Sequence, residues 1–90
     1  MSEILQGLLL AVNDQLRSPA TPYVKATYER LRNLGLGDEQ VREEIADCLG
    51  QELDEMLEKK RPFDEKSYRL LLDALPWQEE PVSSNDLGQL

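Results

Sequence analysis

The sequence predicts an all-α fold, a small four-helix bundle with a disordered C-terminal tail. Apolar residues recur every three or four positions in four separate segments, which is the periodicity of amphipathic helices. No segment shows the alternation of apolar and polar residues that is typical of a strand. The 90 residues suffice for one modest core, so we expect a helical domain over residues 1–77 and a flexible acidic tail over residues 78–90.

The first helix is expected over residues 2–16. Ser2 is the predicted N-cap residue, and Glu3 suits the positive end of the helix dipole. The segment 17–20 contains Pro19 and ends the helix. The expected apolar stripe consists of Ile4, Leu5, Leu8, Leu9, Val12 and Leu16.

The second helix is predicted to start at Thr21-Pro22, because a hydroxyl side chain caps a helix N-terminus and proline fits the first helical position. We expect it to end near Leu34, where Gly35 supplies a left-handed C-terminal residue. The expected apolar face consists of Val24, Tyr28, Leu31 and Leu34.

The third helix is predicted to begin at Asp38 as the N-cap residue and to continue to the basic run 59–61. Such a helix is about 30 Å long, enough to span the domain. Gly50 costs about 1 kcal/mol relative to alanine inside a helix, so we expect another backbone to approach closely there. The expected apolar stripe consists of Val41, Ile45, Cys48, Leu49, Leu53, Met56 and Leu57.

The fourth helix is expected between two prolines, Pro62 and Pro76. Asp64 is its predicted N-cap residue, and Phe63 is expected to pack as a hydrophobic staple against Tyr68 or a neighbouring residue. Its predicted buried face consists of Tyr68, Leu71, Leu72 and Leu75. Two interpretations of Trp77 remain open: it covers the end of the core, or it is an exposed aromatic anchor for a partner.

The net charge of −8 belongs entirely to the third helix. Residues 38–58 carry nine acidic residues and one basic residue, whereas the rest of the chain carries nine of each. This balance argues against nucleic acids and anionic membranes as partners, since both require clustered lysine and arginine. The longest apolar run, residues 8–12, is also far too short to cross a membrane.

Three interpretations of this acidic helix remain open. It is a solvated face, neutralised in part by bases of the second helix; a docking face for a basic protein; or a weak divalent-cation site on carboxylate rows such as Glu52-x-x-Glu55-x-x-Glu58. The neutralising bases would be Lys25, Arg30 and Arg32. The candidate partner-binding residues are Glu44, Asp47, Glu55, Glu58 and Trp77.

Catalysis is not expected. The chain contains no histidine, which removes the commonest general base and the commonest transition-metal ligand. Cys48 lies on the apolar stripe and is predicted to be buried and inert. With a single cysteine no internal disulfide can form, so we expect a reducing cytoplasm. No cofactor is predicted.

Three segments carry a resemblance to a known family. They are Tyr28-Glu29-Arg30-Leu31, Cys48-Leu49-Gly50-Gln51-Glu52, and 61–68 followed by Leu71 and Leu72. Together they resemble the C-terminal half of a bacterial family of small, mostly helical proteins classified as a domain of unknown function. The resemblance implies a bacterial, cytoplasmic, helical protein and supplies no activity. Longer members carry histidines that this chain lacks, so no metal site transfers.

The function expected from these observations is non-enzymatic protein–protein contact. A homodimer is one expected form, because the wide apolar faces of the first, third and fourth helices exceed what a small core covers. Binding of a basic protein by the third helix is the alternative, and weak cation binding is the second alternative.

Overall fold

The computed structural model describes residues 3–76. They form four helices, α1 (Glu3–Arg17), α2 (Pro22–Asn33), α3 (Asp38–Lys59) and α4 (Glu65–Asp73), and the described chain contains no strand. The predicted all-α fold is confirmed. The predicted domain boundary at residue 77 and the predicted tail lie outside the described residues.

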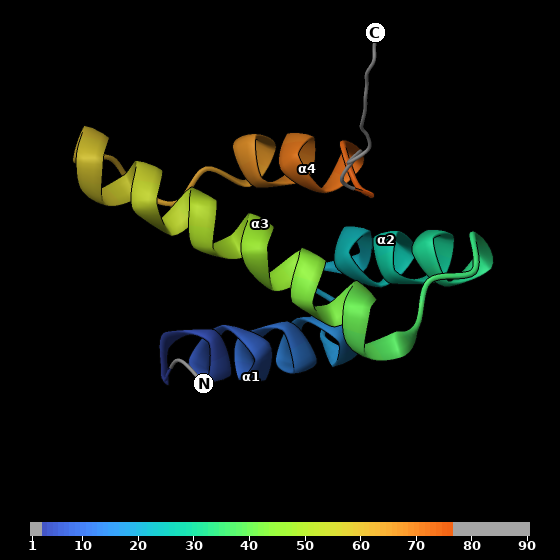
Figure 1. The fold of residues 1–90 in the computed structure, drawn as a ribbon. Helices are drawn as coiled ribbons and strands as arrows, with labels where there is room; N and C mark the ends of the chain where they lie inside the picture. Colours follow the sequence, from blue (N-terminus) through green and yellow to red (C-terminus); the bar gives the residue numbers. More distant parts are fainter. Residues whose placement is uncertain (1–2, 77–90) are drawn as a thin grey trace, which may run out of the picture.

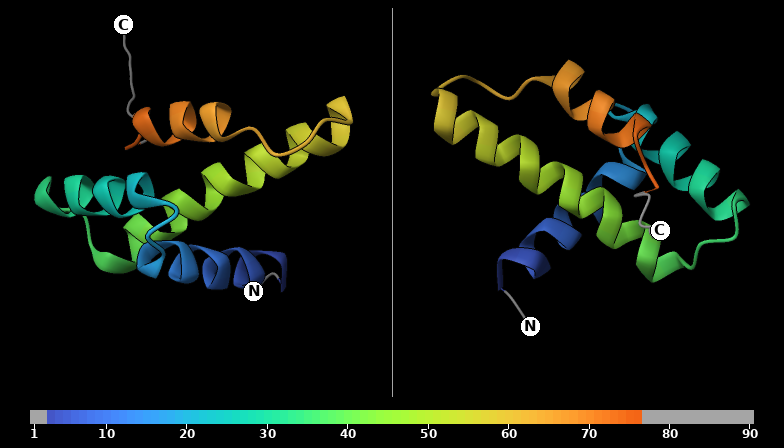
Figure 2. Two further views of the ribbon diagram at one scale, coloured as in Figure 1. Left: turned by 180° about the vertical axis from the view of Figure 1, so that it is seen from behind. Right: turned by 45° about the horizontal axis from the view of Figure 1, so that its top comes forward.

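Helix α3 is the centre of the arrangement. It lies between α1 and α4, and α2 packs against all three other helices (Figure 1). Both views in Figure 2 show that the C-terminal turns of α3 extend past the start of α1. The N-terminal part of α3 is therefore enclosed by neighbours, whereas one side of its C-terminal part is not.

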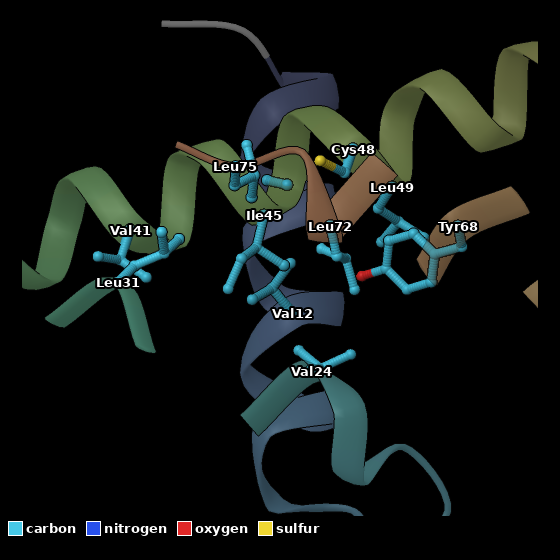
Figure 3. Close-up of a cluster of buried hydrophobic side chains, with 11 residues drawn as sticks. Val12, Val24, Leu31, Val41, Ile45, Cys48, Leu49, Tyr68, Leu72 and Leu75 are labelled. Carbon is cyan, nitrogen blue, oxygen red and sulfur yellow. The ribbon is translucent and has the colours of Figure 1, made fainter. Parts of the chain in front are cut away.

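The core draws apolar side chains from all four helices (Figure 3). Ile45 of α3 lies at its centre beside Val12 of α1, and both are fully buried. Tyr68 of α4 is also fully buried, and its hydroxyl donates a hydrogen bond to Oε1 of Gln15 at 2.7 Å. The buried apolar set is Val12, Val24, Leu31, Val41, Ile45, Ala46, Cys48, Leu49, Tyr68, Leu72 and Leu75.

Three predicted helix signals are confirmed. Asp64 caps α4, because its carboxylate accepts hydrogen bonds from the backbone N–H groups of Lys66 at 3.0 Å and Ser67 at 3.4 Å. Gly35 has a φ of 101°, the left-handed conformation that glycine adopts without a steric penalty. Phe63 packs edge-on against Tyr68, with ring centroids 5.6 Å apart, as the predicted staple requires.

One predicted cap is confirmed in part and another is wrong. Thr21 is the N-cap residue of α2 and Pro22 is its first residue, as predicted, but the Thr21 hydroxyl makes no capping bond and instead donates a hydrogen bond to the carbonyl of Gln15 at 2.9 Å. Gly37 is the N-cap residue of α3, and Asp38, one position later, accepts hydrogen bonds from Tyr28 and Arg42. In both cases a competing partner lies outside the turn to be capped: the backbone carbonyl of Gln15 for Thr21, and the side chains of Tyr28 and Arg42 for Asp38.

The predicted apolar stripe of α3 is buried only in part. Leu53 is 37% exposed and Leu57 is 78% exposed, because α1 covers α3 only as far as the contact between Leu8 and Gly50. At Gly50 a Cβ atom would lie 3.2 Å from Cδ1 of Leu8. The close approach expected at this glycine is therefore present, but a side chain makes it rather than a backbone.

Candidate functional site

A hollow of about 440 Å³ lies between α1 and α3. It lies beside the point where the two helices touch, with α1 supplying one wall and α3 the other. Its lining residues are Ile4, Leu8, Asp47, Gly50, Gln51, Leu53 and Asp54. We call this hollow the α1/α3 groove.

Exposed apolar side chains lie in and next to the α1/α3 groove. Ile4 on the α1 wall is 76% exposed. Leu53 lies on the α3 wall, and Leu57 follows it one turn later on the same face. Apolar groups that gather on one side of a small domain are typical of a contact surface rather than of a solvated face.

Four exposed carboxylates run along α3, and two of them, Asp47 and Asp54, line this groove. Glu43, Asp47, Asp54 and Glu58 are separated by four, seven and four residues, so they share one stripe of the helix. Within residues 3–76 none of them forms an ion pair. We call these four residues the acidic row.

Two other α3 acids form ion pairs within the helix itself. Asp38 pairs with Arg42 at 2.9 Å, and Glu55 pairs with Lys59 at 2.7 Å. The predicted neutralisation by bases of α2 is wrong for Arg30, which donates hydrogen bonds to carbonyls at the end of α4, those of Leu72 at 3.0 Å and Leu75 at 2.8 Å. No ion pair in the described part of the chain joins α2 to α3.

The predicted partner-binding residues differ in exposure and do not all lie on one surface. Asp47 and Glu58 are exposed and belong to the acidic row. Glu44 is only 9% exposed, so its expected place on an exposed face is wrong. Glu55 is half-buried and paired with Lys59. Trp77 lies outside the described residues.

Glu44 is buried because its position on α3 faces the packed side of the helix. Its Oε2 atom accepts a hydrogen bond from Gln40 at 3.1 Å. Its Oε1 atom is buried without a hydrogen-bond partner. A carboxylate in this position is not available to an incoming partner.

Glu52 is the second buried acid of α3, with no exposed surface. The chain turns back at Lys60, whose φ of 51° is left-handed, and this turn brings the guanidinium of Arg61 to Glu52 at 2.6 Å and 3.2 Å. The backbone N–H of Asp64 donates a third hydrogen bond to Glu52 at 2.8 Å. These bonds, the Arg61 bonds foremost, lower the pKa of Glu52 from 4.5 to about 2 although burial raises it.

This arrangement bears on the predicted cation row at Glu52, Glu55 and Glu58. Glu52 could serve as a ligand only by giving up its bonds to Arg61 and Asp64, and Glu55 is paired with Lys59. Residues 3–76 contain no group of three acidic or cysteine side chains arranged to hold a metal ion. Glu52 instead joins the end of α3 to the start of α4.

Cys48 is fully buried in the core. Burial, together with the nearby carboxylates of Asp47 and Glu44, raises the pKa of its thiol to about 12. A thiol in this state is a poor nucleophile, because the thiolate is the reactive form.

A second hollow, of about 510 Å³, lies between α2 and α4. Its cationic side chains already have partners. Arg69 pairs with Glu65 at 3.6 Å and lies 5.0 Å over the ring of Tyr23, and Arg30 is bonded to the end of α4. These groups serve the contact between the two helices and leave no unpaired arginine for a ligand.

The sequence reasoning did not assign eight residues of this surface to a site. They are Ile4, Leu8, Glu43, Gly50, Gln51, Leu53, Asp54 and Leu57. The acidic members could have been found from spacing, since the separations of four, seven and four residues mark one stripe. The exposure of the apolar members depends on where α1 ends relative to α3, which no local pattern encodes.

Neither a family model, nor a curated protein, nor a solved structure matches this chain. The resemblance to a bacterial family of helical proteins stays an expectation. None of the helices in the described part is both long enough and apolar enough to cross a membrane.

Proposed function

We propose that this chain is a non-catalytic protein-binding module whose α1/α3 groove takes a basic segment of a protein partner. One observation carries the proposal: the exposed Leu53 lines the same groove as Asp47 and Asp54, and the acidic row to which these two carboxylates belong forms no ion pair within residues 3–76. An apolar surface supplies binding free energy through burial, and unpaired charge beside it selects a partner of opposite sign.

The electrostatic side of the proposal follows from helix α3 itself. Like charges four residues apart, such as Asp54 and Glu58, each destabilise a helix by a few tenths of a kcal/mol. A partner that brings lysine or arginine to the acidic row relieves this repulsion, and the relief adds to complex formation. Binding should therefore weaken as salt screens these exposed charges.

Two features support a non-catalytic role in a cytoplasmic setting. The Cys48 thiol is buried with a raised pKa, and the chain contains no histidine to serve as a base. A single cysteine suits a reducing compartment. The net charge of −8 supports a protein partner over a nucleic acid.

Self-association is the second candidate, because the exposed leucines of α3 could also be covered by a second copy. A symmetric dimer through the α1/α3 groove would bring two acidic rows together, and like charges across an interface are costly. We therefore favour a basic partner. Sedimentation equilibrium at micromolar concentration decides between them: a mass near 10.3 kDa supports the basic partner, and a dimer that Leu57→Gln dissolves supports self-association.

The test of the proposed function is partner capture with matched variants. A photo-reactive amino acid placed near Leu57 is cross-linked in an extract of the source cells, and the attached peptide is identified by mass spectrometry. The groove variants are Leu57→Gln and Asp54→Lys. The controls are Leu70→Gln, whose leucine is 71% exposed on α4, and Glu29→Lys on an exposed site of α2.

We expect one cross-linked partner segment rich in lysine and arginine. Both groove variants should reduce its yield about tenfold, the effect of losing one buried leucine or one paired charge, and both controls should leave it unchanged. Equal yields from all four variants would refute a role for the α1/α3 groove.

A further inference from the structure

We infer that the partner segment binds the α1/α3 groove as an amphipathic α-helix. Its lysine and arginine residues lie on one flank of its apolar stripe and not on the other. This inference rests on the proposed function and goes beyond it, because it names the conformation of the bound segment and the position of its charges. Three features of the groove lead to it.

The first feature is the backbone of the two walls. Both walls are helices, and the N–H and C=O groups of a helix interior are bonded within that helix. An extended segment pairs its backbone with a sheet edge, and neither wall offers one. A segment buried between two helices must therefore satisfy its own backbone groups, as a helix does.

The second feature is the spacing of the apolar side chains. Ile4 and Leu8 on α1 are four residues apart, and so are Leu53 and Leu57 on α3. Each pair forms a short ridge along its helix, and ridges of this spacing interdigitate with apolar residues at i, i+4 and i+7 of a third helix. Gly50 lines the groove without a side chain, and Cδ1 of Leu8 packs over this position.

The third feature is the asymmetry of charge across the groove. The acidic row lies along α3, from Glu43 to Glu58, a length of about 22 Å at 1.5 Å per residue. The α1 wall consists of Ile4 and Leu8 and contributes no charged side chain to the lining. Helix α1 crosses α3 steeply (Figure 3), so a bound helix that follows α3 meets carboxylates along one flank and the apolar side chains of α1 on the other flank only within the groove.

The test uses three synthetic peptides of about 18 residues, long enough to cover the acidic row as a helix. All three have the same leucine, lysine and glutamine content. In the first, leucines follow helical spacing and all lysines lie on one flank. In the second, the lysines are divided between both flanks. In the third, leucine and polar residues alternate, as in a strand. Affinity for the full chain is measured by calorimetry, and peptide helicity by circular dichroism.

We expect the first peptide to become helical on binding and to bind at least tenfold more tightly than the other two. Leu57→Gln and Asp54→Lys should each weaken it about tenfold, whereas Leu70→Gln and Glu29→Lys should not change it. Equal affinity of the alternating peptide would overturn the helical conformation. Equal affinity of the peptide with divided lysines would overturn the one-flank arrangement.

Two further outcomes would also overturn the inference. One is the absence of binding by all three peptides, and the other is binding that Leu57→Gln leaves unchanged. A fourth peptide has the sequence of residues 77–90. If it displaces the first peptide at equal concentration, a segment of this same chain occupies the groove and the inference is also overturned. Partner capture is measured with the proteins of an extract and not with these peptides. The capture experiment can therefore succeed when the peptide experiment fails, and the two proposals can fail separately.

Discussion

The bonds that Arg61 makes to Glu52 should stabilise the fold in a way that depends on pH. Glu52 has a pKa of about 2 in the folded chain, against an ordinary value of 4.5. A lowered folded-state pKa contributes stability that is complete above the ordinary value and is lost as pH falls through the folded value. The stabilisation is therefore fully present above about pH 5 and nearly gone at pH 2.

The magnitude follows from the same two pKa values. Each pH unit between them contributes about 1.4 kcal/mol, which gives an upper value of roughly 3 kcal/mol. The side chain of Arg61 is 25% exposed, so water screens the pair and we expect about 2 kcal/mol. With a urea dependence of about 1 kcal/mol/M for a domain of this size, removing the charge should lower the midpoint of unfolding by about 2 M.

The assay is urea unfolding of the original chain and of Glu52→Gln, followed by circular dichroism at pH 7 and at pH 2. The midpoints should differ by about 2 M at pH 7 and should nearly coincide at pH 2. Glu58→Gln is the matched control, because Glu58 is exposed and has no ion pair in the described structure, and it should match the original chain at both values. A difference between Glu52→Gln and the original chain that is the same at both pH values would refute the reasoning.

Four further changes have defined expected results. Ile45→Ala should lower the free energy of unfolding by about 3 kcal/mol in urea titrations, because it opens a cavity at a fully buried position. Asp64→Ala should lower it by about 1 kcal/mol, since two backbone N–H groups of α4 lose their acceptor. Gly50→Ala should raise the melting temperature through a gain below about 1 kcal/mol, because Cδ1 of Leu8, the only nearby atom, can move aside. Cys48 should resist Ellman's reagent at pH 8 in the folded chain and react rapidly in urea, as expected for a buried thiol of raised pKa.

The sequence predicts the features of this fold that depend on neighbours along the chain. Asp64 caps α4 and Gly35 ends α2, because each acts on backbone groups within a few residues of itself. The buried part of the α3 stripe, such as Ile45, is also predicted, since helical periodicity brings these residues to one face. Cys48 is buried for the same reason.

Features that depend on distant segments escape the same reasoning. Periodicity identifies Leu57 as part of an apolar stripe, but Leu57 is exposed because α1 diverges from the C-terminal turns of α3 (Figure 2). The charge of Glu44 suggests an exposed side chain, yet its position on the helix buries it. Glu52 is bonded to Arg61 because the chain turns back at Lys60. Of the candidate site, charge alone identifies Asp47 and Glu58, and the groove beside them requires the structure.

The position of the acidic row also governs how quickly a partner would arrive. Four carboxylates on one edge of α3 form no ion pair within residues 3–76. The negative potential is therefore concentrated at this edge, and it attracts a cationic partner before any contact forms. Such steering raises association rate constants above the roughly 10⁵–10⁶ M⁻¹s⁻¹ of uncharged encounters, and it fades with ionic strength. Added salt should therefore lower the association rate constant far more than it raises the dissociation rate constant, because salt does not screen the apolar contacts of the leucines that hold the bound partner.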